Sequence, residues 1–199
     1  MEYTFFAAIS RMKYINRWSQ MRSSREETLS EHSLDVAMIA HGLCTIANVR
    51  YGKKLDANKA ALIGLYHDAS EIITGDMPTP VKYANEEIRD AYKSIEAKAE
   101  LTLLHKLAPD LREEYRTIFR GEDTPEDAYM RRLVKGADKI SAYIKCIEEE
   151  KAGNSEFKTA KETIRKALFA MVEELPEMKD FVEEYLPSYG KTLDELSSL

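Results

Sequence analysis

The chain has 199 residues, of which 44% are hydrophobic and 32% charged, a size and composition typical of one globular domain. Its 8 glycines and 6 prolines fall well below the usual combined share of roughly 12%, which disfavours collagen-like, low-complexity and turn-rich sandwich folds. The net charge of −6 leaves no general basic surface and disfavours a protein that wraps duplex nucleic acid. We expect a single domain over residues 1–199.

The cysteines and the N-terminal segment bear on the cellular compartment. Cys44 and Cys146 each lie in a helical pattern and cannot form a disulfide framework, which fits buried thiols in a reducing cytosol. The N-terminal segment carries the acidic Glu2 and no basic n-region, and its apolar run, Phe5–Ile9, is short. We therefore expect no signal peptide. No stretch approaches the ~18 apolar residues of a membrane span. We predict a soluble, cytoplasmic protein without a membrane partner.

Apolar residues recur with the 3.6-residue period of a helix along nearly the whole chain, and no alternating β-branched run is long enough to predict a sheet. The pattern predicts an all-α fold. A first helix is expected at about residues 3–15, before a polar stretch from Asn16 to Leu29. Ser30 is a candidate N-cap for a helix that ends before Gly52. The expected apolar face of that helix comprises Leu34, Val36, Ala37, Ile39, Ala40, Leu43, Ile46 and Ala47.

The rest of the chain continues the helical pattern around one irregular loop. Asp56 is a candidate cap for a helix to about Thr74, and the loop Gly75–Pro80 follows it. Further helices are expected at about 85–107 and after Pro109. Thr124-Pro125-Glu126-Asp127 resembles a capping box and opens a helix to about residue 151. Two more amphipathic helices complete the chain, the last between Pro176 and Pro187.

Two adjacent metal-ligand types, His67 and Asp68, follow the otherwise apolar run Ala60–Tyr66, where burying an unpaired charge would cost free energy. A divalent cation would compensate that charge, because imidazole nitrogen and carboxylate oxygen can both be its ligands. Neighbouring helical side chains diverge by ~100°, so other helices must complete the coordination shell. Two candidates are His32, in the first turn of its helix, and Asp138, next to the core position Ala137.

Glu71 lies three residues after Asp68, on the same side of the expected helix, and is a candidate general base for a water near the ion. Each residue also has a structural interpretation: a packed core histidine for His32, an ion pair at a helix end for Asp138, and a surface glutamate for Glu71. His41 lies half a turn from His32 around its helix, so we expect it to pack elsewhere.

Five basic residues and no acid lie between residues 3 and 25, in a chain that is acidic overall. They predict a local positive patch suited to an anionic substrate. Within it, Arg17 and Trp18 place a bidentate phosphate donor beside a flat apolar plate, the two groups needed to hold a phosphate and a sugar or base. The alternative interpretation is that Trp18 anchors a loop to the core. The five residues are Arg11, Lys13, Arg17, Arg22 and Arg25.

The ordered pattern His32, His67-Asp68 and Asp138 is accompanied by four longer characteristic segments. These segments are Ile15-Asn16-Arg17-Trp18, Ser30-Glu31-His32-Ser33-Leu34, Tyr66-His67-Asp68-Ala69-Ser70-Glu71 and Gly75-Asp76-Met77-Pro78-Thr79-Pro80-Val81-Lys82-Tyr83. Together they resemble the YfbR-like 5′-deoxynucleotidases, a family of HD-domain metal phosphohydrolases. The resemblance runs essentially end to end, and its long segments make it more specific than the four candidate ligands.

The resemblance implies a compact all-α HD-domain helical bundle that forms a homodimer and hydrolyses deoxyribonucleoside 5′-monophosphates to deoxynucleoside and phosphate. It implies one divalent cation, with cobalt, manganese or copper expected and zinc or magnesium as alternatives. By the same resemblance, His32, His67, Asp68 and Asp138 ligate the metal and Glu71 positions or activates the water.

The resemblance also implies a substrate pocket. Arg17 would select the phosphate, and Trp18 would face the sugar, packing where a ribose 2′-hydroxyl would have to sit. The catalytic residues would be Glu71, Arg17 and Asp68. The implied substrate-binding residues are Arg17, Trp18, His32, Asp68, Asp76, Met77, Pro78, Thr79 and Asp138.

Other functions compete with this interpretation. Another HD-type enzyme could hydrolyse a nucleoside triphosphate, a cyclic dinucleotide or an alarmone, although the short chain leaves little room for a long polyphosphate site. A non-catalytic regulator that binds a nucleotide or metal is a second alternative, but mere binding does not require Glu71. A third is an interaction protein whose polar helix residues are all structural.

Overall fold

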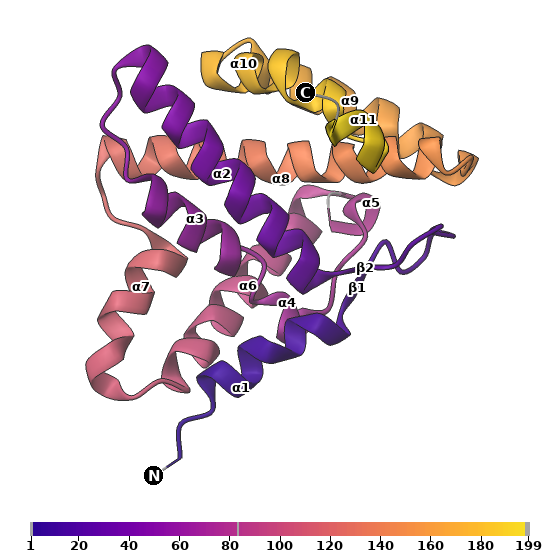
Figure 1. Cartoon of the computed structure of the whole chain (residues 1–199). Helices are drawn as coiled ribbons and strands as arrows, with labels where there is room; N and C mark the ends of the chain where they lie inside the picture. The colour runs from indigo at the N-terminus through magenta and orange to yellow at the C-terminus, as the bar shows by residue number, and fades with distance from the viewer. Residues whose placement is uncertain (1, 83, 198–199) are drawn as a thin grey trace.

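The computed structural model describes residues 2–82 and 84–197. Tyr83, the last residue of one family-like segment, lies outside the described residues. The all-α prediction is confirmed: helices dominate the described chain, and its strands are the two short segments β1 (Asn16–Arg17) and β2 (Glu27–Thr28). Figure 1 shows α2 and α8 crossing at the centre, with the N-terminal and C-terminal segments on opposite sides.

The N-terminal segment is less regular than its periodicity predicts. The first helix is α1 (Phe5–Ile9), continued by a 3₁₀ turn at Ser10–Tyr14, and the following polar stretch forms a hairpin of β1 and β2. The strands are antiparallel and place Arg17 opposite Glu27. A pairing of two residues per strand is too short to produce an alternating pattern, so the sequence analysis missed it.

Helix α2 (Leu29–Tyr51) begins with a capping box on Thr28 rather than at Ser30. The Glu31 side chain accepts the Thr28 N–H at 2.8 Å, and Thr28 Oγ1 accepts the Glu31 N–H at 3.3 Å. Gly52 ends the helix in the left-handed region, with φ of +63°, as glycine readily does. The predicted apolar face is buried except at Leu34, which is 52% exposed because it lies on the outer side of the helix.

Helix α3 (Ala57–Tyr66) starts at the predicted cap Asp56, whose side chain accepts the N–H of Lys59. A Cβ atom on Gly64 would lie 2.8 Å from Cα of Ala37, so glycine allows α3 to pack closely on α2. The helix ends eight residues before the predicted boundary, Thr74. His67 and Asp68 lie in the turn that follows, and α4 (Glu71–Thr74) is a separate short helix.

The middle of the chain packs against the N-terminal segment. Its helices are α5 (Thr79–Lys82), α6 (Glu86–His105) and α7 (Arg112–Arg120), with a 3₁₀ turn at Pro109–Leu111. Helices α1, α6 and α7 surround one hydrophobic cluster, which contains Phe5, Met12, Leu29, Ala69, Leu103, Leu104 and Leu107. This cluster forms the lower half of the molecule in Figure 1.

The long helix α8 (Pro125–Lys151) supports the second and larger cluster. Thr124 caps it and Pro125 is its first residue, both as predicted. After a 3₁₀ turn at Ser155–Phe157, the chain continues with α9 (Lys158–Val172), α10 (Pro176–Glu184), a 3₁₀ turn at Leu186–Ser188 and α11 (Leu193–Ser197). The larger cluster joins α2, α3, α8, α9 and α10 and contains Val36, Leu43, Ile63, Leu133, Ile140, Leu168 and Met178.

The two clusters meet near the N-terminal end of α2 and the C-terminal end of α3. Along α2, Leu29 belongs to one cluster and Val36 to the other, and His32 lies between them. The candidate ligands therefore occupy the junction of two rigid hydrophobic cores. Cys44 and Cys146 are buried free thiols, as predicted. None of the helices within the described residues is long and apolar enough to cross a membrane.

Candidate active site

The two candidate histidine ligands come from α2 and from the turn after α3. His32 is fully buried, and its Nδ1 lies 3.1 Å from Oγ of Ser141. Nδ1 of His67 lies 2.7 Å from the carbonyl oxygen of Gly64, a contact in which the imidazole N–H donates. Donation from Nδ1 leaves Nε2 of His67 as the atom with a free lone pair, the state required of a metal ligand.

The Nε2 atoms of His32 and His67 are buried and form no well-aligned hydrogen bond, but both face carboxylates, and Nε2 of His67 lies 3.0 Å from Oδ2 of Asp68. Together with a carboxylate oxygen of Asp68, they form a group of ligand atoms that all lie within 4.8 Å of one another. Asp138, from the middle of α8, places Oδ1 3.3 Å from Nε2 of His32. Ligand atoms at about 2.0–2.2 Å from one ion would have such mutual separations. These residues therefore fit a divalent cation, with nitrogen and oxygen donors from three parts of the fold.

The charges at this cluster favour binding of a cation. Burial opposes ionisation of Asp68, but the neighbouring His67 outweighs it and lowers the pKa of Asp68 to about 2. For Asp138, burial is likewise outweighed, chiefly by the 3.3 Å contact with Nε2 of His32, and the pKa is lowered well below the usual value. Burial disfavours the charged form of His67, yet Asp68 raises its pKa to about 9. The two carboxylates thus favour a positive charge at this point, which a proton on His67 or a bound cation would supply.

Glu71 is brought to the site by the turn after α3 and not by the continuous helix that the sequence analysis expected. Its N–H donates to the carbonyl oxygen of Asp68 at 2.9 Å, and its side chain is buried with Oε2 unpartnered. The surface-glutamate interpretation is therefore wrong. Burial first, and then the negative charges of Asp68 and Asp76, raise the pKa of Glu71 to about 9. The side chain can hold a proton beside the candidate metal ligands.

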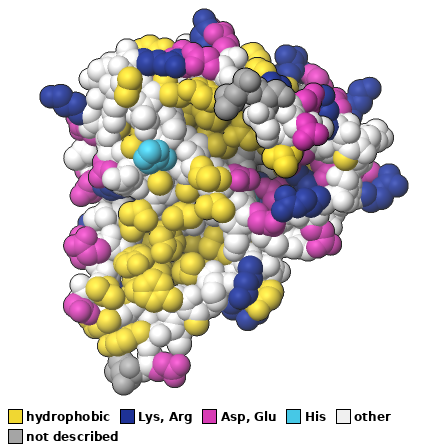
Figure 2. All heavy atoms as spheres, in the orientation of Figure 1, with side chains coloured by type: hydrophobic (Ala, Val, Ile, Leu, Met, Phe, Trp, Pro, Cys, Tyr) yellow, Lys and Arg dark blue, Asp and Glu magenta, His cyan; other side chains and the backbone are white. Residues whose placement is uncertain are grey.

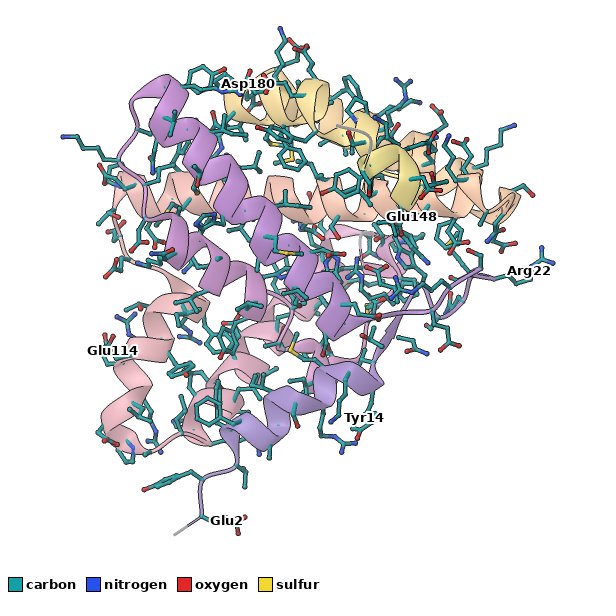
Figure 3. The ribbon with its side chains drawn as sticks, in the orientation of Figure 1. Glu2, Tyr14, Arg22, Glu114, Glu148 and Asp180 are labelled. Atoms are coloured by element: carbon teal, nitrogen blue, oxygen red, sulfur yellow. The ribbon has the colours of Figure 1, made fainter. Side chains whose placement is uncertain are left out.

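Arg17 faces the ligand cluster from the hairpin. Its side chain is 11% exposed, and Nη1 donates to Oδ2 of Asp68 at 3.4 Å. The predicted positive patch is otherwise wrong, because the remaining four basic residues point elsewhere. Arg22, 92% exposed, pairs with Glu156 and extends away from the fold (Figure 3), and Arg25 pairs with Glu31. Arg11 and Lys13 lie over the ring of Tyr14.

Trp18 connects the hairpin to two other parts of the molecule. It is the one non-glycine residue of the described chain with a positive φ, +58°, which is unusual for a bulky side chain. Its N–H donates to Asp76 Oδ2 at 3.3 Å, and its ring meets that of Phe157 edge-on at a centroid separation of 5.3 Å. Trp18 is half-buried, and these contacts anchor the loop, as the alternative interpretation expected.

Residues 75–78 of the predicted loop are irregular, whereas Thr79 and Pro80 begin α5. Asp76 ties the loop to the hairpin through Trp18. Met77 and Pro78 are half-buried in this loop, and Thr79 is the exposed first residue of α5. On the other side of the ligand cluster, a cavity of about 260 Å³ has His67 and Asp138 in its wall. Its other lining residues include Tyr66, Glu100, Phe119 and Lys135.

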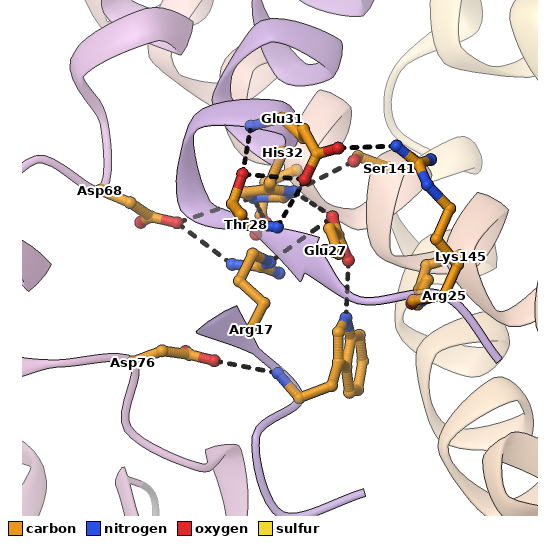
Figure 4. A network of polar contacts seen from close by, with 12 residues as sticks. Arg17, Arg25, Glu27, Thr28, Glu31, His32, Asp68, Asp76, Ser141 and Lys145 are labelled. Carbon is orange, nitrogen blue, oxygen red and sulfur yellow. Dashed lines mark hydrogen bonds and ion pairs between the residues drawn. The ribbon is translucent and has the colours of Figure 1, made fainter. Parts of the chain in front are cut away.

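Glu27 is a site residue that the sequence analysis missed. Its carboxylate accepts the indole N–H of Trp18 at 2.9 Å and lies 3.5 Å from Nδ1 of His32 and 3.7 Å from Nε of Arg17 (Figure 4). Burial opposes its charge, but the His32 contact and the Arg17 cation outweigh this and lower the pKa of Glu27. Only the pairing of β2 with β1 places it here, and no motif within the polar stretch indicated that pairing. By contrast His41, which was expected to pack, is exposed on α2.

The comparisons with known proteins agree with the geometry. The family model described as "5′-deoxynucleotidase YfbR-like" matches residues 4–189. The chain belongs to the YfbR-like 5′-deoxynucleotidase family. The family predicted from the sequence is thus confirmed. A curated 5′-deoxynucleotidase of Shewanella oneidensis is 46% identical over 196 residues, covering 98% of this chain and 97% of that protein. One from Vibrio vulnificus is 46% identical over 193 residues, covering 97% of each.

Solved structures show the same fold. An HD-domain phosphohydrolase from Listeria innocua superimposes with a TM-score of 0.77 at 24% identity, covering 94% of this chain and 88% of that one. The HD phosphohydrolase DatZ of cyanophage S-2L, solved with dA and one catalytic Zn²⁺ ion, has a TM-score of 0.66 at 19% identity and covers 96% and 98%. This member of the YfbR-like family therefore has the HD-domain helical fold.

Proposed function

We propose that this chain is a metal-dependent 5′-deoxynucleotidase, which hydrolyses deoxyribonucleoside 5′-monophosphates to a deoxynucleoside and phosphate. The observation that carries the proposal is the convergence of unpartnered imidazole nitrogens and carboxylate oxygens in a chain of this family. A purely structural role would leave the two buried imidazole nitrogens without well-aligned hydrogen bonds, at a cost in stability. The proposed metal ligands are His32, His67, Asp68 and Asp138.

The proposed chemistry divides between the cation and the chain. When bound, a divalent cation supplies a Lewis acid that polarises a phosphate oxygen and makes water more acidic. Arg17, whose Nη1 already reaches Asp68, would bind the equatorial phosphate oxygens and offset the charge that develops on them. Glu71 would take the proton of the attacking water on Oε2, which has no partner. Burial, and then the charges of Asp68 and Asp76, raise the pKa of Glu71, and a cation bound at Asp68 would remove that carboxylate's part of the rise.

Substrate binding is proposed on the hairpin side of the cluster. Trp18 would face the deoxyribose and leave no room or partner for a 2′-hydroxyl, so ribonucleotides would be rejected by an unpaired polar group. The half-buried indole beside Arg17 supports this placement. The loop residues Asp76, Met77, Pro78 and Thr79 would shape the rest of the pocket, and the bond from Trp18 N–H to Asp76 supports their proximity. DatZ, a fold relative, was solved with dA.

The finer properties of the enzyme are also proposals. We propose cobalt, manganese or copper as the activating ion, with zinc or magnesium as alternatives, because a mixed imidazole and carboxylate site accepts several of these ions. We propose a cytoplasmic homodimer. The exposed apolar side chains on α1, α2 and α3 support an interface, and Figure 2 shows hydrophobic atoms gathered over the face where these helices lie. They include Phe6, Leu34, Met38, Leu62 and Leu65.

The test of the function is a phosphate-release screen of the metal-free protein supplied with manganese, cobalt, magnesium or zinc. Deoxyribonucleoside monophosphates, ribonucleoside monophosphates and deoxyribonucleoside triphosphates are the substrates. We expect metal-dependent release from the deoxy monophosphates and weaker release from the others. Equal turnover of AMP and dAMP would contradict the role of Trp18, and preferential hydrolysis of triphosphates would favour another HD activity.

A further inference from the structure

Glu27 is the point at which three residues of the proposed site meet. It lies opposite Arg17 in the antiparallel pair of β1 and β2, and its side chain is 13% exposed. One carboxylate oxygen accepts the Trp18 indole N–H at 2.9 Å. The other lies 3.7 Å from Nε of Arg17 and 3.5 Å from Nδ1 of His32. Figure 4 shows the Glu27 side chain pointing between Arg17 and His32. The Glu27 carboxylate thus lies next to the residues proposed to bind the sugar (Trp18), the phosphate (Arg17) and the metal (His32).

The bond from Trp18 to Glu27 selects the direction in which the indole faces. An indole has one hydrogen-bond donor and no acceptor, so an acceptor on one side distinguishes the two flipped orientations of the ring. Phe157 contacts the ring edge-on, and Asp76 holds the backbone N–H, but neither bonds Nε1. The left-handed backbone at Trp18 is a conformation that surrounding contacts must maintain. Glu27 is therefore the contact that fixes the orientation of the polar edge of the ring.

We propose that Glu27 is a positioning residue that sets the discrimination between deoxyribose and ribose by fixing the indole of Trp18. The proposal rests on the proposed function, in which Trp18 faces the sugar. Glu27 does not touch the substrate in this account. It holds the Trp18 ring against which a 2′-hydroxyl would collide. Its charge also orients the Arg17 guanidinium, because Glu27 lies near Nε while Asp68 contacts Nη1.

The chain supplies its own probe, because Trp18 is its only tryptophan and intrinsic fluorescence therefore reports on this ring alone. Glu27→Met removes the acceptor and keeps a side chain of similar length. Glu27→Gln keeps a carbonyl acceptor for the indole N–H and removes the charge. The matched control is Glu26→Met, since Glu26 is the exposed neighbouring carboxylate and bonds Asn16 instead of the site. Thermal unfolding of each full-length variant establishes that it is folded.

For Glu27→Met we expect red-shifted emission and stronger quenching by acrylamide, because the released indole becomes more mobile and more exposed. The ratio of kcat/KM for dAMP to that for AMP should fall roughly tenfold, the equivalent of one hydrogen bond. Glu27→Gln should retain the wild-type fluorescence and most of the dAMP preference, while Glu26→Met should match wild type in both. If Glu27→Met does not fold, Glu27→Ala serves as the second variant without an acceptor.

Two results would overturn the proposal. One is wild-type fluorescence in folded Glu27→Met or Glu27→Ala, which would show that Glu27 does not hold the ring. The other is an altered fluorescence with an unchanged dAMP to AMP ratio, which would show that ring orientation does not set the preference. A wild-type protein that hydrolyses no deoxyribonucleoside monophosphate would refute the proposed function separately, since the fluorescence comparison requires no turnover.

Discussion

Two buried polar clusters flank the same hairpin, and they differ in how their atoms are satisfied. At the C-terminal end of α8, Lys145 donates to Glu149 and to the carbonyl oxygen of Arg25, each at 2.5 Å. Glu149 also accepts from the Ser24 N–H and from Asn154. At the ligand cluster, by contrast, Nε2 of His32 and of His67 form no well-aligned hydrogen bond, although carboxylate oxygens lie 3.3 and 3.0 Å from them. The first cluster is a closed clamp on the loop, and the second directs nitrogen and oxygen atoms that a cation could bind toward one point.

An unpartnered atom alone does not identify a site. Glu177 on α10 is fully buried and has an unpartnered oxygen, but its other oxygen accepts from Tyr129 and no set of metal-ligand side chains surrounds it in the described chain. The ligand cluster differs because several donor types converge. The proposed site is therefore distinguished by several ligand atoms that lie close together, because a buried polar group alone also occurs elsewhere in the fold.

The largest effect is expected from His67→Ala, which removes one of the proposed metal ligands. Phosphate release from dAMP should fall to background, a loss at least as large as the ~10² to 10³-fold typical of one transition-state donor. Addition of excess manganese should not restore it. His41→Ala is the matched control, because His41 is an exposed histidine on α2 and should retain wild-type turnover. Retention of activity in His67→Ala would remove the metal assignment.

Arg17→Ala should lower kcat for dAMP by about 10² to 10³-fold, because the guanidinium would no longer offset charge on the phosphate oxygens. Cation binding should persist, since no ligand is lost. Arg22→Ala is its control: Arg22 belongs to the same basic stretch but is 92% exposed and pairs with Glu156. Steady-state kinetics of both variants on dAMP measure this loss. An unchanged kcat and KM for Arg17→Ala would exclude a role of Arg17 in phosphate binding.

At the closed clamp the expected effect is on stability instead. Glu149→Ala leaves the buried Lys145 without its carboxylate and should lower the free energy of unfolding by about 3 kcal/mol. Glu150→Ala, in which an exposed pair with Lys161 is lost, should lower the free energy of unfolding far less than Glu149→Ala does. Urea unfolding of both variants measures the difference. Equal stabilities would mean that the clamp contributes nothing beyond a surface ion pair.

The clamp also predicts that the protein loses stability at acid pH. Burial opposes the charge of Glu149, but hydrogen bonds from Lys145, Ser24 and Asn154 outweigh it and lower its pKa to about 2. Because the folded pKa lies below the unfolded one, the stabilisation is complete above pH ~5 and is lost as pH falls toward 2. The unfolding free energies of wild type and Glu149→Gln should therefore converge by on the order of 1 to 2 kcal/mol between pH 6 and pH 3. A pH-independent difference would contradict the shift.

Signals within a few neighbouring residues were readable from the sequence. The caps at Asp56 and Thr124 and the stop at Gly52 were predicted because each depends on one turn of backbone. The start of α2 was also readable, since Thr28 and Glu31 have capping-box spacing, although Ser30 was preferred. The break after Tyr66 was not, because no proline or glycine marks the turn at residues 67–70.

The candidate site divides in the same way. The residue types and order of His32, His67, Asp68 and Asp138 were informative, because only a few side-chain types can bind a metal ion. Glu71 was placed near them for the wrong geometric reason, a continuous helix. Glu27 was missed because its role depends on a two-residue strand pairing, which leaves no periodic signal.

The central claim is most directly tested by titrating manganese or cobalt into chelator-treated protein and measuring phosphate release from dAMP on the same samples. The account predicts one tightly bound ion per chain in wild type and in His41→Ala, no such binding in His67→Ala, and hydrolysis that rises in proportion to occupancy. Full hydrolysis by the metal-free protein, or wild-type ion binding in His67→Ala, would contradict it.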